Sequence, residues 1–233
     1  MANENDYRRH ALTVRVTHWI NAVALILLLM SGLQIFNAHP KLYWGHSSYS
    51  GAAPVFELTD GFPSWATIPS NRWLAMGRRW HLFFAWVLVI NGMVYLLYST
   101  KSRHVARDLA PSKSDWRSIG RSIVEHLHFR HPQGEAAKHY NVLQKLSYLA
   151  VIFILLPMMI VTGWSMSPWL NSIATGWVDI FGGRQSARTL HFIMAWLLVL
   201  FVLIHVFQVI VSGFWNNLRS MITGRYRIAR EDE

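Results

Sequence analysis

Hydrophobic and polar positions along this chain are grouped in long blocks. Four stretches contain no Asp, Glu, Lys or Arg: 16–40, 80–100, 146–178 and 189–218. About 20 apolar helical residues cross a bilayer core about 30 Å thick, so each stretch is long enough to span a membrane. The pattern predicts an all-α integral membrane four-helix bundle, bent at Pro157 in its third helix. The predicted spans lie near 16–36, 80–98, 145–166 and 189–213.

The positive charges indicate how these spans are oriented. Of the 22 Lys and Arg residues, sixteen lie in the two tails, in the loop 99–144 and at Lys145, and six lie in the loops 37–79 and 167–188. The positive-inside rule therefore predicts one membrane domain over 1–233 with both termini and the loop 99–144 in the cytoplasm. Most of the net charge of +10 is then explained by the orientation of the spans in the membrane, which argues against nucleic-acid binding.

Composition narrows the chemistry further. The chain has no Cys, which excludes disulfides, thiolate-bound iron–sulfur clusters and covalent haem attachment. Only 15% of residues are charged, compared with about 25% in a typical soluble domain.

Two loops carry patterns of their own. Aromatic residues within the loop 37–79 predict either a lid at the lipid interface or a docking surface for an external partner; they are Tyr43, Trp44, Trp65 and Trp73. In the cytoplasmic loop, apolar residues recur at helical spacing beside a face with Lys113, Arg117 and Arg121, which predicts an amphipathic helix on the inner leaflet. Those apolar residues are Trp116, Ile119, Ile123 and Leu127.

The second and fourth spans open with the same pattern. Residues 78–89 and 188–199 share Arg, His, Ala, Trp, Leu and Val in the same register, and residues 15–19 repeat part of it. This similarity indicates an internal duplication.

Four of the twelve histidines lie within the predicted spans: His18, His81, His191 and His205. The predicted topology places His81 and His191 near the outer face and His18 near the inner face. His205 follows His191 by fourteen residues, which is about 21 Å along a helix and about 40° of rotation. Depth therefore pairs His81 with His191 and His18 with His205.

Two imidazoles at one depth are what a six-coordinate haem iron needs, and occupied axial positions favour electron transfer over oxygen binding. The sequence thus predicts two non-covalent b haems. Non-haem iron and zinc sites, the competing possibility, need three or four ligands at one level. Arg15, Arg78 and Arg188 each precede a histidine by three residues and either bind haem propionates or are ordinary flanking cations.

Small residues inside the spans either leave room for porphyrin or allow close helix packing. They are Ser31, Gly32, Gly92, Thr162 and Gly163.

With these motifs, the chain resembles the di-haem cytochrome b subunits of formate dehydrogenase, nickel–iron hydrogenase and thiosulfate reductase, a bacterial cytochrome b561-like family. The resemblance rests on Arg-x-x-His-Trp in span one, Arg-x-x-His in spans two and four, the His191–His205 spacing, and the segment 140–145. It implies a location in the inner membrane of a bacterial cell and electron transfer between a periplasmic redox subunit and membrane quinone near the inner haem.

The same resemblance implies that Asn141 and Gln144 contact a quinone carbonyl, whereas Leu143 replaces a residue that is often Gly in the family. Asn141 as a simple helix cap is the alternative. Residues 181–188 and the long first loop resemble the branch that partners a sulfite-oxidase-fold molybdopterin enzyme.

The expected function is therefore a di-haem membrane subunit of an oxidoreductase, with quinol oxidation or quinone reduction as its chemistry. One alternative is a free-standing superoxide:quinone oxidoreductase of the cytochrome b561 type. A second is a transporter in which the four histidines relay protons or solute.

Overall fold

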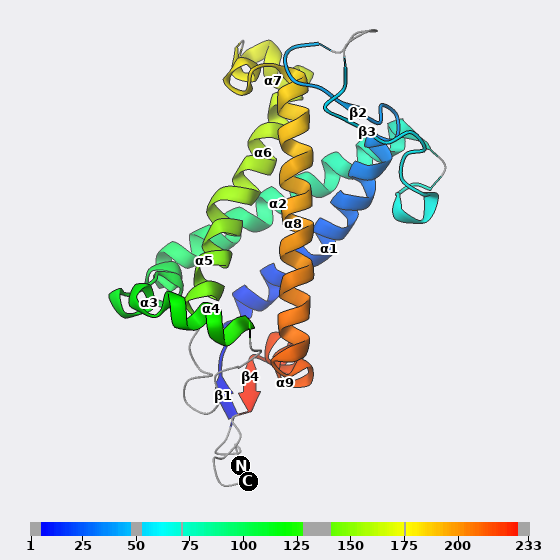
Figure 1. Ribbon diagram of the computed structural model, residues 1–233. Coiled ribbons are helices and arrows are strands. Elements are labelled where there is room, and N and C mark those ends of the chain that lie inside the picture. The colour runs from blue at the N-terminus through cyan, green and yellow to red at the C-terminus, as the bar shows by residue number, and fades with distance from the viewer. Residues whose placement is uncertain (1–5, 48–52, 71, 128–140, 175, 228–233) are drawn as a thin grey trace. The chain divides into compact units, whose positions relative to one another are not determined.

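The computed structural model describes residues 6–47, 53–70, 72–127, 141–174 and 176–227 (Figure 1). Within these ranges, four helical stretches are long and apolar enough to cross a membrane, which confirms the predicted helical membrane fold. They are α1 (Leu12–Phe36), α2 (Leu74–Ser102), the stretch Val142–Ser165 and α8 (Arg184–Val211).

All four helical stretches begin before the predicted spans, and the third does so at Val142 instead of residue 145. The helices α1, α2 and α8 start four to six residues earlier than the apolar stretches suggest and include Arg15, Arg78 and Arg188. Arginine is a good helix former, so a charged residue at the edge of a span continues the helix although it ends the hydrophobic pattern.

The third span is interrupted next to its proline. It consists of α5 (Val142–Ala150), the π-helical turn η4 (Val151–Leu155) and α6 (Leu156–Ser165). Pro157 lies in the first turn of α6 and has no backbone N–H to donate to the preceding turn. The π-helical turn is the local change through which the helix accommodates the proline.

Short elements connect the spans. The predicted amphipathic helix forms as two helices that meet at Ser118, whose backbone leaves the helical region. The short helices are η1 (Ser64–Ala66), η2 (Val105–Leu109), α3 (Lys113–Arg117), α4 (Ile119–Leu127), α7 (Pro168–Ile173), η5 (Trp177–Phe181) and α9 (Phe214–Thr223). Antiparallel pairs form between β1 (Asp6–Arg8) and β4 (Arg225–Arg227), and between β2 (Lys41–Leu42) and β3 (Phe56–Glu57).

The chain forms two compact units. The first contains residues 1–19, 92–153 and 199–233, and the second contains residues 20–91 and 154–198. The helices α1, α2 and α8 each contribute residues to both units. His18 and His205 belong to the first unit, and His81 and His191 belong to the second, so each predicted pair lies within one unit.

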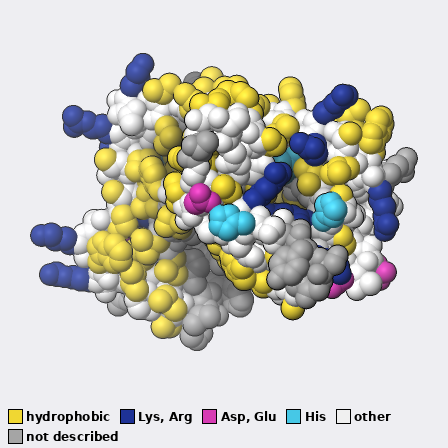
Figure 2. Space-filling view, turned by 90° about the horizontal axis from the view of Figure 1, so that it is seen from above, with side chains coloured by type: hydrophobic (Ala, Val, Ile, Leu, Met, Phe, Trp, Pro, Cys, Tyr) yellow, Lys and Arg dark blue, Asp and Glu magenta, His cyan; other side chains and the backbone are white. Residues whose placement is uncertain are grey.

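Burial within the units is the reverse of that in a soluble protein. The fully buried side chains are mostly small or polar, among them Ser31, Gln34, Thr162 and Ser165, while large apolar side chains of all four spans are exposed. Figure 2 shows hydrophobic side chains covering broad areas of the surface, with Lys and Arg side chains projecting from it. Lipid solvates such a surface, and small residues inside let helices approach closely.

Candidate haem-binding sites

The second unit brings His81 of α2 and His191 of α8 together. Their ring centroids are 6.1 Å apart and the ring planes are inclined by 64°. A metal–imidazole bond is about 2.0–2.1 Å long, and the ring centre lies roughly 1.1 Å behind the nitrogen, so two imidazoles that share one metal have centroids roughly 6.3 Å apart. The observed spacing therefore fits a single iron between the two rings.

The contacts of His81 identify its tautomer. Its Nδ1 lies 3.1 Å from the Leu28 carbonyl oxygen and 3.1 Å from Ser31 Oγ. A carbonyl oxygen only accepts hydrogen bonds, so Nδ1 carries the proton. The other ring nitrogen, Nε2, then has the lone pair that binds a metal.

His191 has equivalent contacts. Its Nδ1 lies 3.0 Å from Thr162 Oγ1. The Thr162 hydroxyl donates to the Met158 carbonyl at 2.6 Å, so its oxygen accepts from the imidazole. His191 therefore also leaves Nε2 available.

Two glycines lie against these rings. A Cβ added to Gly32 or to Gly163 would be 3.4 Å from Cε1 of His81 or His191, respectively. The sequence suggested that these small residues leave room for porphyrin or allow close helix packing. The structure shows a different role for Gly32 and Gly163, because each lies directly against an imidazole ring. Gly92 differs, since a Cβ there would have no heavy atom within 4 Å.

The first unit brings His18 of α1 and His205 of α8 together, with ring centroids 6.3 Å apart and planes inclined by 57°. Phe201 stacks on His205 at 5.8 Å, and Tyr148 of α5 lies 6.4 Å from the same ring. Within the described part of the chain, Nδ1 of His18 is buried without a hydrogen-bond partner.

The chemistry of these donor sets favours haem over other metal sites. Across the residues that the structure describes, no three or more His, Cys, Asp or Glu side chains are grouped to hold a metal ion. A haem iron whose porphyrin supplies four donors would need only two ligands from the protein, and each pair offers two imidazoles.

The three arginines have different surroundings. Arg188 donates to the backbone carbonyls of His39 and Lys41, whereas Arg78 is exposed. Arg15 donates to the Ile222 carbonyl, but its Nε is buried and has no partner among the described residues. Of the three, Arg15 therefore keeps a buried donor for an anionic group.

Burial lowers the pKa of His10, which lies just before α1, to about 4, and the charges of Arg9, His18, His104 and Arg15 add to this effect.

Asn141 and Gln144 meet at the start of α5. The Asn141 side chain accepts from the Leu143 N–H at 3.0 Å, and Gln144 Oε1 accepts from the Asn141 N–H at 3.2 Å. Together they form a capping box, the structural role that the sequence had left open for Asn141. Tyr140, at the start of the family-like segment, lies outside the described residues.

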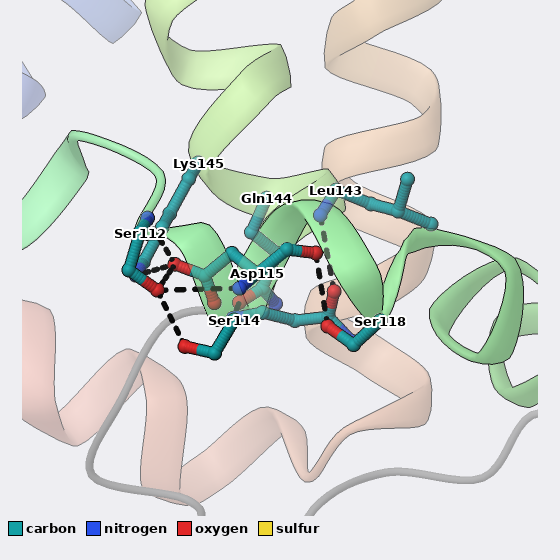
Figure 3. Close-up of polar contacts among 8 residues, drawn as sticks. Ser112, Ser114, Asp115, Ser118, Leu143, Gln144 and Lys145 are labelled. Carbon is teal, nitrogen blue, oxygen red and sulfur yellow. Dashed lines mark hydrogen bonds and ion pairs between the residues drawn. The ribbon is translucent and has the colours of Figure 1, made fainter.

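An ion pair fixes this helix start. Figure 3 shows Asp115 of α3 beside Lys145 of α5, and their side chains are 2.8 Å apart. The Ser112 N–H and hydroxyl also donate to the Asp115 carboxylate. The Lys145 ammonium, followed by the Ser112 N–H, lowers the pKa of Asp115 to about 2.

Comparison with known proteins assigns the chain to a family. Residues 9–224 match the sequence model of the prokaryotic cytochrome b561 family. The chain belongs to this family.

Individual relatives of this cytochrome b561 agree with the family assignment. A putative protein-methionine-sulfoxide reductase subunit YedZ1 from Azospira oryzae is 29% identical over 94% of this chain and 97% of its own length. A probable Ni/Fe-hydrogenase B-type cytochrome subunit from Cupriavidus necator is 23% identical over 94% of this chain and 85% of its own. A protein of the same description from Bradyrhizobium diazoefficiens is also 23% identical, over 91% and 82%.

Membership confirms the suspected family and makes this protein an integral membrane b-type cytochrome that carries electrons by means of haem b. Sequence reasoning did not identify the roles of Ser31 and Thr162 in this cytochrome. The repeated signal was present, because each hydroxyl residue precedes a glycine within a span.

Proposed function

We propose that this cytochrome is the di-haem subunit of a membrane oxidoreductase, which carries electrons from quinol to a redox partner in the periplasm. The observation that supports this most directly is the presence of two imidazole pairs with centroid spacings of 6.1 and 6.3 Å, each of which suits one iron. His18 and His205 are the proposed ligands of the haem on the cytoplasmic side, and His81 and His191 those of the haem on the periplasmic side.

When bound, haem supplies an iron that cycles between its ferric and ferrous states and carries one electron. The four histidines would hold the two irons, and with two imidazoles on each iron no coordination site would remain for oxygen. Arg15, Arg78 and Arg188 are the proposed propionate contacts, with Arg15 best supported because its buried Nε has no partner in the described ranges. Quinol oxidation releases two electrons and two protons near the start of α5, where Asn141 and Gln144 are the proposed polar contacts.

The orientation in the inner membrane is part of the proposal. With both termini in the cytoplasm, the loops 37–79 and 167–188 face the periplasm and are available to a partner. Large apolar side chains are exposed in both loops, including Trp65 at 80% and Trp169 at 71%. The relative named as a subunit of a methionine-sulfoxide reductase supports a reductase partner, which we expect to be molybdopterin-dependent.

A haem count combined with ligand variants tests the pairing. The purified chain should contain two b haems, and H18A and H205A should lose the same one, whereas H81A and H191A should lose the other. The haem that remains shows that each variant has folded. His46→Ala is the matched control, because its side chain is 69% exposed, and it should keep both haems. Loss of different haems from H18A and H205A would refute the pairing.

The quinone contacts need variants that preserve the capping box. Asn141→Ser keeps an N-cap oxygen and removes the amide, and Gln144→Glu keeps the acceptor of the box. We expect both to raise the KM for quinol without lowering thermal stability. Unchanged KM values would show that these residues do not contact quinol and serve only as the capping box of α5.

Co-purification from native membranes tests the partner. A molybdopterin protein that elutes with the cytochrome and oxidises its haems with sulfoxide supports the proposal. Haem reduction by superoxide in the isolated chain, with quinone as acceptor and no partner present, would instead support the free-standing alternative.

A further inference from the structure

The second unit contains one arrangement twice, built from two different pairs of helices. In each case a hydroxyl residue and the glycine after it face a histidine: Ser31 and Gly32 of α1 face His81, and Thr162 and Gly163 of α6 face His191. The two hydroxyl oxygens lie 3.1 and 3.0 Å from the respective Nδ1 atoms. At His81, the Leu28 carbonyl oxygen, three residues before the hydroxyl, also lies 3.1 Å from Nδ1.

The direction of these hydrogen bonds follows from the hydroxyl protons. Ser31 Oγ lies 2.6 Å from the Leu27 carbonyl oxygen, and Thr162 Oγ1 lies 2.6 Å from that of Met158. Because a hydroxyl has only one proton, each oxygen that donates to its own helix accepts from the imidazole. Both side chains are 0% exposed, so these bonds lie where water does not weaken them.

The first unit offers a contrast on one of its ligands. Nδ1 of His18 is buried and has no acceptor among the residues described. A hydrogen bond from the distal nitrogen of a ligating histidine fixes the ring and raises the basicity of the nitrogen that binds the metal. A more basic ligand stabilises ferric iron relative to ferrous iron and lowers the reduction potential.

We propose that Ser31 and Thr162 are positioning residues that lower the reduction potential of the haem held by His81 and His191. The inference rests on the proposed function, since it requires a haem between these two histidines. The two hydroxyls contact different histidines of the pair, so their contributions should add. The residues would thereby set the potential of the haem that exchanges electrons with the partner, while leaving the other haem unaffected.

The test is a potentiometric titration of the haem-loaded protein, followed by haem absorbance, on matched variants. Thr162→Val removes the hydroxyl at nearly constant volume, and Thr162→Ser retains it. Thr162→Val should raise the reduction potential of the haem that H191A removes. Thr162→Ser, which keeps the hydroxyl, should leave that potential close to the value of the unmodified protein. Ser31→Ala should raise the same potential, and the double variant should show roughly the sum of the two shifts.

Ser165→Ala provides the control for packing. Ser165 is also 0% exposed and lies on α6, but its hydroxyl bonds the Val161 carbonyl of its own helix. This variant should leave both potentials unchanged. The electron paramagnetic resonance signal of the ferric haem that H191A removes should shift in Thr162→Val and not in Ser165→Ala.

Three outcomes would overturn the inference: no shift in Thr162→Val, equal shifts of both haems, or a shift in Ser165→Ala as large as that in Thr162→Val. Failure of the proposed function would look different. In that case the unmodified chain would contain fewer than two haems, or H81A and H191A would remove none.

Discussion

Gly32→Leu tests whether the close contact between Gly32 and the His81 ring holds a haem ligand in place. An ideal Cβ at Gly32 is already 3.4 Å from His81 Cε1. Leucine extends beyond Cβ by bonds of about 1.5 Å, which brings its outer carbons well inside the normal contact distance of about 3.5–4.0 Å unless the ring moves. Alanine adds only the Cβ and remains in ordinary contact.

The expected result is a selective loss of haem. Gly32→Leu should displace His81 and reduce the haem-to-protein ratio to about half, whereas Gly32→Ala should keep both haems; the overpacking itself costs about 1–3 kcal/mol. Pyridine haemochrome assays and reduced-minus-oxidised spectra measure the ratio. Gly163→Leu should remove the same haem, because Gly163 lies against His191.

Gly92→Leu is the matched control within a span. A Cβ at Gly92 has no heavy atom within 4 Å, so this variant should keep its full haem content. The reasoning is refuted if Gly32→Leu keeps two haems with unchanged spectra, or if Gly92→Leu loses as much haem as Gly32→Leu.

Two further predictions concern stability and orientation. Asp115→Asn should lower the free energy of unfolding in detergent by roughly 1–2 kcal/mol at pH 7, because the partly buried pair with Lys145 is lost, whereas Asp179→Asn, with its side chain 60% exposed, should change it little. Folding lowers the Asp115 pKa from 3.8 to about 2, so this stabilisation is complete above about pH 4 and is lost as the pH falls towards 2, which thermal melts at several pH values would show. Since the chain has no Cys, a single introduced Cys is the only thiol that a labelling reagent can modify. Trp65→Cys, at an 80% exposed position, should react with a membrane-impermeant reagent from the periplasm, whereas Trp215→Cys, at a 79% exposed position, should react only after the inner membrane is opened. The reverse labelling pattern would show that the topology is inverted.

The four spans were predictable because lipid imposes a simple length and hydrophobicity requirement on each helix. Helix ends were less predictable, because Arg15, Arg78 and Arg188 extend the helices beyond the apolar stretches. The break at Ser118 also escaped prediction, since the apolar spacing of the amphipathic segment continues through it.

The histidine pairs were accessible from sequence by depth alone. Fourteen residues along one helix correspond to a nearly whole number of turns, so His191 and His205 share a face and differ in level. Depth could not reveal what lies beside each ring. The same limit applies to Asn141 and Gln144, where the motif suggested a ligand contact and the structure adds a capping box.

The order of residues along the chain therefore determined the number of membrane helices, the family and the four candidate ligands, because these depend on local composition and on helical periodicity. Only the tertiary structure decided which hydroxyl, carbonyl or glycine meets each imidazole. Such contacts join residues of different helices, as with Ser31 and His81, and they depend on how each helix is rotated about its own axis. That rotation is set by the packing of small buried residues between helices, which no single stretch of sequence specifies.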